Sequence, residues 1–278
     1  MTKRGVCREP VENFFDGVFV VKLYIMFFSM HLKSQMQYKV SFFLTALGQF
    51  LVSFSALLGV YFMFSRFNAV DDFSFEHALL AFAVVLMAFS MAEMLGRGFD
   101  TFPRMIGNGE FDRVLVRPRS IIFQVLAGRM DFTRVGRLVQ AILVFVYAIP
   151  NSGVIWTWDK ILTLCLMVIC GFLIFFALFV VYAAVSFFTI EGIEFMNIFT
   201  DGGREFGRYP FSIYGRTILR FLTFVIPLAL FQYYPLLYLL DREQGLLYML
   251  LPLAGLLFLL PCYGFFRIGL RRYKSTGS

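Results

Sequence analysis

The sequence predicts an all-α, polytopic membrane protein with six transmembrane helices. Of the 278 residues, 59% are hydrophobic and only 15% are charged, whereas soluble domains carry about 25% charged residues. The chain also has 38 phenylalanines, and a soluble fold of this size could not bury so much apolar surface. Lipid must therefore be the solvent for much of the chain, and apolar runs of helical length recur along it.

Charged residues separate these apolar runs, and a helix needs about 20 residues to cross the hydrocarbon. Five runs meet or nearly meet that length. The third run is short unless its helix begins near Asp131, with arginines at its base. The six expected spans lie between Lys39 and Arg66 and over His77–Gly96, Val135–Pro150, Ile161–Ile190, Phe221–Leu240 and Gln244–Phe266.

A shorter apolar run, Val18 to Met30, precedes the first span. Lys22, Ser29 and Lys33 fall on one face of a helix here, which predicts an interfacial helix with a polar stripe toward water. A seventh span is the alternative. The expected organisation is an N-terminal arm with this interfacial helix, residues 1–37, followed by a six-span transmembrane domain, residues 38–278.

Basic residues are distributed unevenly between the two sides of the spans. If the N-terminus is cytoplasmic, 22 of the 25 Lys and Arg residues fall in inside segments, and only Arg66, Lys160 and Arg242 fall outside. This positive-inside bias places both termini in the cytoplasm. The external connections are short, so no extracellular domain is expected. The inside segments are the arm through Lys39, residues 97–137, residues 191–220 and the tail after Phe266.

The motifs of several enzyme classes are absent from the sequence. It contains no G-x-x-x-x-G-K-[ST] phosphate loop, no H-E-x-x-H, no G-x-S-x-G and no G-x-G-D. His31 and His77 are expected on opposite sides of the membrane, so they would not share a metal. We expect no catalytic residue, metal or cofactor in this chain. The net charge of +7 matches the positive-inside pattern, and no nucleic-acid partner is expected.

The four cysteines show no paired spacing, and we expect them to pack as small apolar residues. They are Cys7, Cys165, Cys170 and Cys262.

Glu93 is the main ionisable residue inside an expected span, where charge is costly. Arg97 follows at i+4, the favourable order for a helical ion pair. We expect Glu93 and Arg97 to form a structural pair at the cytoplasmic boundary. A role in a substrate or proton path is the alternative, but a proton relay needs several buried titratable groups and this chain offers few.

The stretch GEFDRVLVRPRS, residues 109–120, gathers charge inside the largest cytoplasmic loop, about residues 97–134. Its apolar residues Phe111, Val114 and Leu115 recur at the spacing of one face of a short helix, which Pro118 would end. Such a helix suits docking into a groove on a soluble partner. Alternatively, the arginines of the loop reach anionic lipid headgroups.

Residues 109–120 resemble the G-x-(hydrophobic)-D-x-x-L-x-(R)-P-x-S element of type-2, export-class ATP-binding-cassette (ABC) transporter permeases. The resemblance is closest to a prokaryotic branch formerly described as of unknown function. Three further stretches are similar to that branch: Gln35–Lys39, Gly207–Tyr214 and Ile226–Pro235. The resemblance covers nearly the whole chain in length, span count and loop sizes. At Arg119 the chain departs from the smaller or apolar residue of many relatives.

This resemblance implies a permease subunit of an ATP-driven exporter in a prokaryotic plasma or inner membrane. Two permease subunits, the same or related, would form the substrate path within the lipid bilayer. Two copies of a separately encoded cytoplasmic ATPase would bind ATP and Mg. The alternatives are an ion-driven secondary transporter, a non-transporting scaffold and an ABC importer. The residues implied at the ATPase interface, in or beside a coupling helix, are Phe111, Asp112, Val114, Leu115, Arg117 and Pro118.

Overall fold

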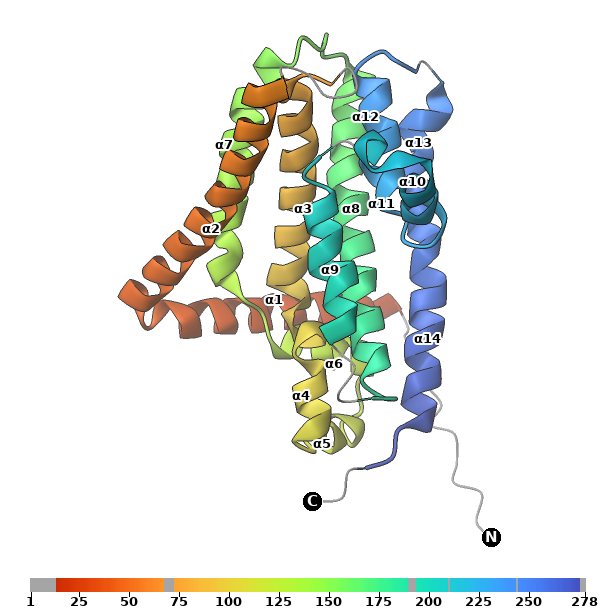
Figure 1. Cartoon of the computed structure of the whole chain (residues 1–278). Helices are drawn as coiled ribbons and strands as arrows, with labels where there is room; N and C mark the ends of the chain where they lie inside the picture. The colour runs from red at the N-terminus through yellow and green to blue at the C-terminus, as the bar shows by residue number, and fades with distance from the viewer. Residues whose placement is uncertain (1–13, 68–72, 190–193, 210, 244, 276–278) are drawn as a thin grey trace.

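A computed structural model describes residues 14–67, 73–189, 194–209, 211–243 and 245–275. Long helices stand side by side, and one helix lies across them near one end (Figure 1). The elements are α1 (Phe14–Met36), α2 (Lys39–Phe67), α3 (Phe75–Asp100), α4 (Phe102–Gly107), α5 (Phe111–Leu115), α6 (Ile121–Gly128), the 3-10 turn η1 (Phe132–Arg134), α7 (Val135–Asn151), α8 (Trp158–Val185), α9 (Glu194–Phe206), η2 (Phe211–Tyr214), α10 (Gly215–Phe224), α11 (Leu228–Phe231), α12 (Tyr233–Leu239), α13 (Leu246–Gly255), η3 (Leu256–Phe258) and α14 (Leu259–Arg272).

Five helical stretches of the described chain are long and apolar enough to cross a membrane. They confirm the first four predicted spans and the sixth. The third stretch begins at η1, so arginines do stand at its base. The five stretches are Lys39–Arg66, Phe75–Gly107, Phe132–Asn151, Trp158–Val185 and Leu246–Arg272.

The predicted fifth span is not one helix. α10 and the α11–α12 segment are apolar enough to span together, but they are bent by 87°. Pro227 stands at the break, as the residue before α11, and proline has no N–H to continue a helical hydrogen-bond ladder. The fifth span expected over Phe221–Leu240 is therefore a broken pair of helices, and the described part of the chain has six spans if this pair counts as one.

The segment 191–220, expected in the cytoplasm, is also placed differently. Its helix α9 runs alongside α3 and α8 (Figure 1). The Arg204 guanidinium lies 4.9 Å from the centre of the Phe89 ring, near the middle of α3. The charged residues of α9 lower its mean hydropathy, so its apolar face was not recognised from the sequence. Phe199 and Phe206 pack from that face against the core. This segment is part of the helix bundle.

α3 is the central helix, packed between α7 and α8, and it carries apolar or small residues on nearly every side. α2 is the opposite case, since only 22% of its most apolar stretch is buried, compared with 78% for α3. Most of the α2 surface therefore has no protein neighbour within this chain, and lipid or another subunit has to cover it.

α1 lies across the bundle near the end that carries α4 and α5, the α5 end (Figure 1). Gln35 fixes it there, because its Nε2 donates to the Met130 carbonyl at 2.6 Å and its Oε1 accepts from the Phe132 N–H at 3.0 Å. The His31 Nε2 also lies 2.9 Å from the Ala127 carbonyl oxygen. This placement fits the interfacial helix that the sequence predicts.

Candidate coupling helix and buried charge network

α5 is held to the bundle by Phe111, whose side chain is fully buried. Its ring packs edge-on against three other aromatic rings, so α5 is tied to α4 and to the chain segments that follow α8 and α14. The ring centres lie 5.1 Å away for Phe102, 5.5 Å for Phe187 and 4.9 Å for Tyr273.

Asp112 strengthens this attachment. Its carboxylate accepts hydrogen bonds from the Tyr273 hydroxyl at 3.1 Å and from the Ser275 hydroxyl at 2.6 Å. Both donors belong to the segment after α14. Phe111 and Asp112 thus connect α5 to the C-terminal end of the last helix, a link between residues far apart in sequence.

The outer surface of α5 is apolar at its C-terminal end. Leu115 is 42% exposed and Val116 is 83% exposed, and Arg117 and Pro118 are exposed beside them. Val114 is half-buried, and its carbonyl accepts from Gln124 Nε2 at 3.2 Å. The predicted apolar face is therefore divided: Phe111 points into the bundle, Leu115 points out, and Val116 is an exposed residue that the helical spacing did not predict.

The predicted Glu93–Arg97 pair is present, with Arg97 Nη1 3.6 Å from Glu93 Oε1. Glu93 nevertheless lies closer to two other arginines, Arg134 at 2.9 Å and Arg137 at 2.7 Å. Glu93, Arg134 and Arg137 are all buried. The expected local pair is one edge of a larger network that joins α3 to η1 and α7.

The network continues toward the α5 end. Arg97 also pairs with Asp100 and approaches Asp131 at 4.0 Å. Arg134 pairs with Asp131 at 3.3 Å and donates to the Gln49 side chain of α2 at 2.7 Å. One signal for these partners was present in the sequence, namely the arginines at the base of the third span. Helix spacing could not reveal that they fold back onto Glu93.

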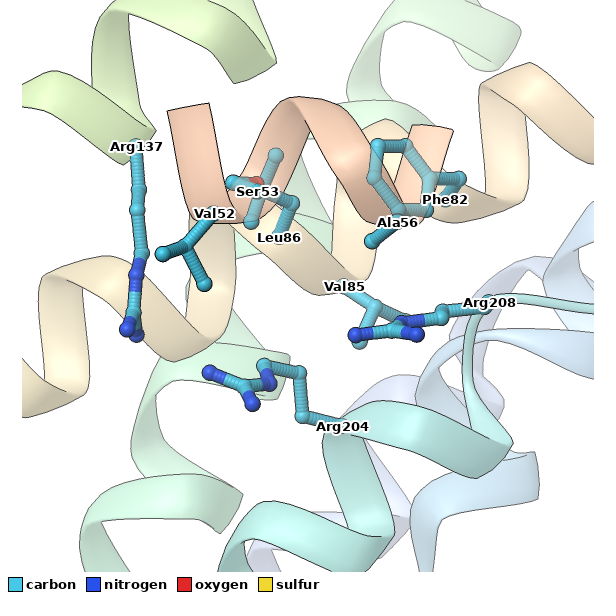
Figure 2. Close-up of a pocket in the computed structure, with 9 residues that line it drawn as sticks. All are labelled: Val52, Ser53, Ala56, Phe82, Val85, Leu86, Arg137, Arg204 and Arg208. Carbon is cyan, nitrogen blue, oxygen red and sulfur yellow. The ribbon is translucent and has the colours of Figure 1, made fainter. Parts of the chain in front are cut away.

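Sequence reasoning missed a second group of arginines because residues 191–220 were expected in a cytoplasmic segment and not beside α3 and α8. α9 and the turn after it bring Arg204 and Arg208 toward Arg137 of α7, around a small pocket between α2, α3 and α9 (Figure 2). Within α9, Arg204 Nη2 lies 2.9 Å from Glu205 Oε1 and 3.6 Å from Asp201 Oδ1, and Arg208 also pairs with Glu205.

No group of three or more His, Cys, Asp or Glu side chains in the described residues is arranged to hold a metal ion. His31 and His77 lie at opposite ends of the bundle, since His31 contacts Ala127 whereas His77 Nε2 lies 3.2 Å from the Ser152 carbonyl oxygen at the start of the α7–α8 connection. Cys165, Cys170 and Cys262 are free thiols, and Cys7 lies outside the described residues.

Apolar helices of spanning length, a broken helix pair and charges buried among them are the features of a multi-pass membrane protein. The chain matches the family described as "ABC-2 family transporter protein" over residues 50–277, and it belongs to that family. The resemblance inferred from residues 109–120 is confirmed. No curated protein and no solved structure matches the chain in the comparisons made.

Proposed function

We propose that this chain is the permease subunit of an ATP-driven exporter, coupled through α5 to a cytoplasmic ATPase. The observation that carries the proposal is that α5 is fixed internally by Phe111 and Asp112 while Leu115 and Val116 are exposed. An exposed apolar helix end beside arginines suits docking into a groove of a soluble protein. In this proposal, two ATPase copies bind ATP and Mg, and this chain supplies no catalytic group.

The contacts of α5 determine which helices a movement of the ATPase would displace. Phe111 contacts rings at the ends of α8 and α14 and in α4, which continues directly from α3. A displacement of α5 would therefore reach three long helices through one packed cluster. Packed interfaces have discrete arrangements rather than continuous ones, so such a lever can switch the spans between two packings.

In this proposal, the substrate path lies between two permease subunits, the same or related. α2 supplies the surface, because most of its apolar residues have no partner within the chain. Sites between packed helices are a usual place for ligands. The membrane would be the plasma or inner membrane of a prokaryote, with both termini and α5 in the cytoplasm, as the positive-inside bias predicts.

The experiment changes the exposed apolar end of α5. Leu115→Asp places a charge on the docking surface while Phe111 keeps its packing, so insertion and expression should persist. We expect at least a tenfold loss of ATPase subunit recovered in a mild-detergent pull-down, and a similar loss of ATPase stimulation. The matched control is Ile155→Asp, an equally severe change at a residue 75% exposed in the connection between α7 and α8.

Unchanged recovery of the ATPase with Leu115→Asp would show that α5 is not the docking element. Repeated recovery of the wild-type permease without any ATPase would contradict the exporter itself. Uphill transport by the purified chain alone, driven by an ion gradient, would instead establish a secondary transporter.

A further inference from the structure

Three guanidinium groups converge on one pocket inside the bundle. Arg137 of α7, Arg204 of α9 and Arg208 beyond it point into the same space from different sides (Figure 2). The facing wall is apolar apart from Ser53. It is formed by Val52, Ser53 and Ala56 of α2 and by Phe82, Val85 and Leu86 of α3.

No carboxylate is among the residues that line this pocket. The acidic partners stand behind the arginines: Glu93 pairs with Arg137 at 2.7 Å, and Glu205 pairs with both Arg204 and Arg208. The pocket is therefore lined by guanidinium groups whose carboxylate partners lie outside it. A guanidinium fork retains donors for an additional oxygen acceptor after one ion pair has formed.

The position of these arginines along the membrane span is unusual. Arg204 lies over the ring of Phe89, close to the midpoint of α3 (Phe75–Asp100). Gly207 packs so closely on α3 that an added Cβ would lie 2.8 Å from a Val85 methyl, and the Gln232 side chain donates to the Gly207 carbonyl at 2.9 Å. The fold thus fixes α9 beside the middle of a helix that is long and apolar enough to cross a membrane, and ionisable residues at membrane depth mark functional sites.

The pocket is small in this conformation. Its volume is about 20 Å³, enough for roughly one water molecule. It is bounded by α2, of whose most apolar stretch only 22% is buried. An outward movement of α2 would enlarge the pocket without disturbing the packing of α3, α8 and α9, and would open it toward lipid.

We propose that this pocket recognises the anionic group, phosphate or carboxylate, of an amphipathic substrate. The arginines bind the oxygens, and the apolar wall of α2 and α3 receives the adjoining hydrocarbon. The inference rests on the proposed function, since it names the substrate class of the same permease. A lipid and a small soluble anion share the headgroup chemistry, but only the lipid uses the apolar wall.

The test measures binding to the full-length permease alone, in detergent, by native mass spectrometry. Three probes separate the sources: phosphatidylglycerol, phosphatidylcholine and glycerol 3-phosphate. We expect phosphatidylglycerol to bind at least tenfold more tightly than the other two. Equal binding of phosphatidylcholine would overturn the anion selectivity, and equal binding of glycerol 3-phosphate would overturn the requirement for hydrocarbon.

Substitutions then assign the binding to this pocket. Arg204→Gln with Arg208→Gln should weaken phosphatidylglycerol binding at least tenfold. Arg216→Gln with Arg220→Gln is the matched control, because it removes two exposed arginines of the nearby α10 and should leave binding unchanged. Equal affinity of the pocket variant and the wild type would overturn the proposal.

A second pair of variants keeps the test valid if the glutamine variant fails to fold. Val52→Asp adds a carboxylate to the pocket wall at a residue 61% exposed, and it should weaken anion binding at least fivefold. Leu51→Asp, at a neighbouring residue 55% exposed that does not line the pocket, should not. Since no ATPase is present in this assay, its failure would leave the coupling through α5 untouched.

Discussion

Glu93 shows how a single buried charge organises its surroundings. Burial of one ion is expensive, and the cost is offset only by close partners and further hydrogen bonds. Glu93 has Arg134 at 2.9 Å and Arg137 at 2.7 Å. Arg134 has a second carboxylate partner in Asp131 at 3.3 Å. The carboxylate that Arg137 contacts directly is that of Glu93. Of the two arginines, Arg137 therefore depends more strongly on Glu93.

Glu93→Gln should therefore destabilise the protein. Removing one partner of a buried pair costs about 3–5 kcal/mol because the other charge is left uncompensated. We expect a clear drop in the thermal unfolding midpoint in detergent. Glu110→Gln, an exposed glutamate at the start of α5, is the control and should change the midpoint little.

A double substitution checks the cause of that loss. If Arg137 is the stranded charge, Glu93→Gln combined with Arg137→Gln should recover part of the lost stability, giving a coupling energy of about 1–3 kcal/mol. Additive effects of the two substitutions would show that the ion pair is not the reason.

At the scale of elements, mean hydropathy predicted the helices that are apolar along their whole length. It failed where charged residues within a helix form ion pairs with one another. α8 has no charged residue between Lys160 and its end, so its span was evident. α9 instead pairs Arg204 with Glu205 inside the helix, and no window average can distinguish such a helix from a solvated loop. The break in the fifth span falls at Pro227. A proline indicates a kink but does not give the angle of 87° between the two parts.

The position of the candidate coupling helix could be predicted from the sequence, but the orientation of its side chains could not. The spacing of Phe111, Val114 and Leu115 and the proline at 118 located α5 correctly. Which residue of that face points inward depends on rings contributed by Phe187 and Tyr273, which lie far away in the sequence. The sequence therefore located the helix but not its exposed surface.

Helix contacts can be tested at Gly136, where α7 crosses α2. A Cβ at this position would lie 2.0 Å from the Ala46 carbonyl oxygen, so the backbones would have to separate. Gly136→Ala should lower the unfolding midpoint by an amount equivalent to about 1–3 kcal/mol. It should also loosen the hydrogen bond between Arg134 of η1, just before α7, and Gln49 of α2.

Gly48→Ala is the matched control. It lies on α2, the helix that Gly136 packs against, and an added Cβ there has no neighbour within 4 Å. Alanine has the better helix propensity, so this variant should be unchanged or slightly more stable. Equal effects of the two substitutions would show that α2 does not pack closely on α7.

For the whole molecule, the two proposed sites lie on different parts of one mechanical unit. α5 is joined to α8 and α14 through the ring of Phe111, and the arginine pocket is bounded by α2, which is largely uncovered. The charge network around Glu93 lies between them and contacts α2 through Gln49. In the proposed mechanism, a movement that begins at α5 would reach the α2 wall of the pocket through α3 and α7.

This arrangement requires α5 to face the cytoplasm, which labelling can test. In a variant with its native cysteines replaced by serine, Val116→Cys reports the α5 end, and Ile155→Cys reports the α7–α8 connection at the opposite end (Figure 1). The positive-inside bias predicts that a membrane-impermeant maleimide labels Ile155→Cys in intact cells. Val116→Cys should react only after permeabilisation, and permeabilised cells provide the control for reactivity of both sites. Labelling of Val116→Cys from outside would invert the topology and remove α5 from the reach of any cytoplasmic ATPase.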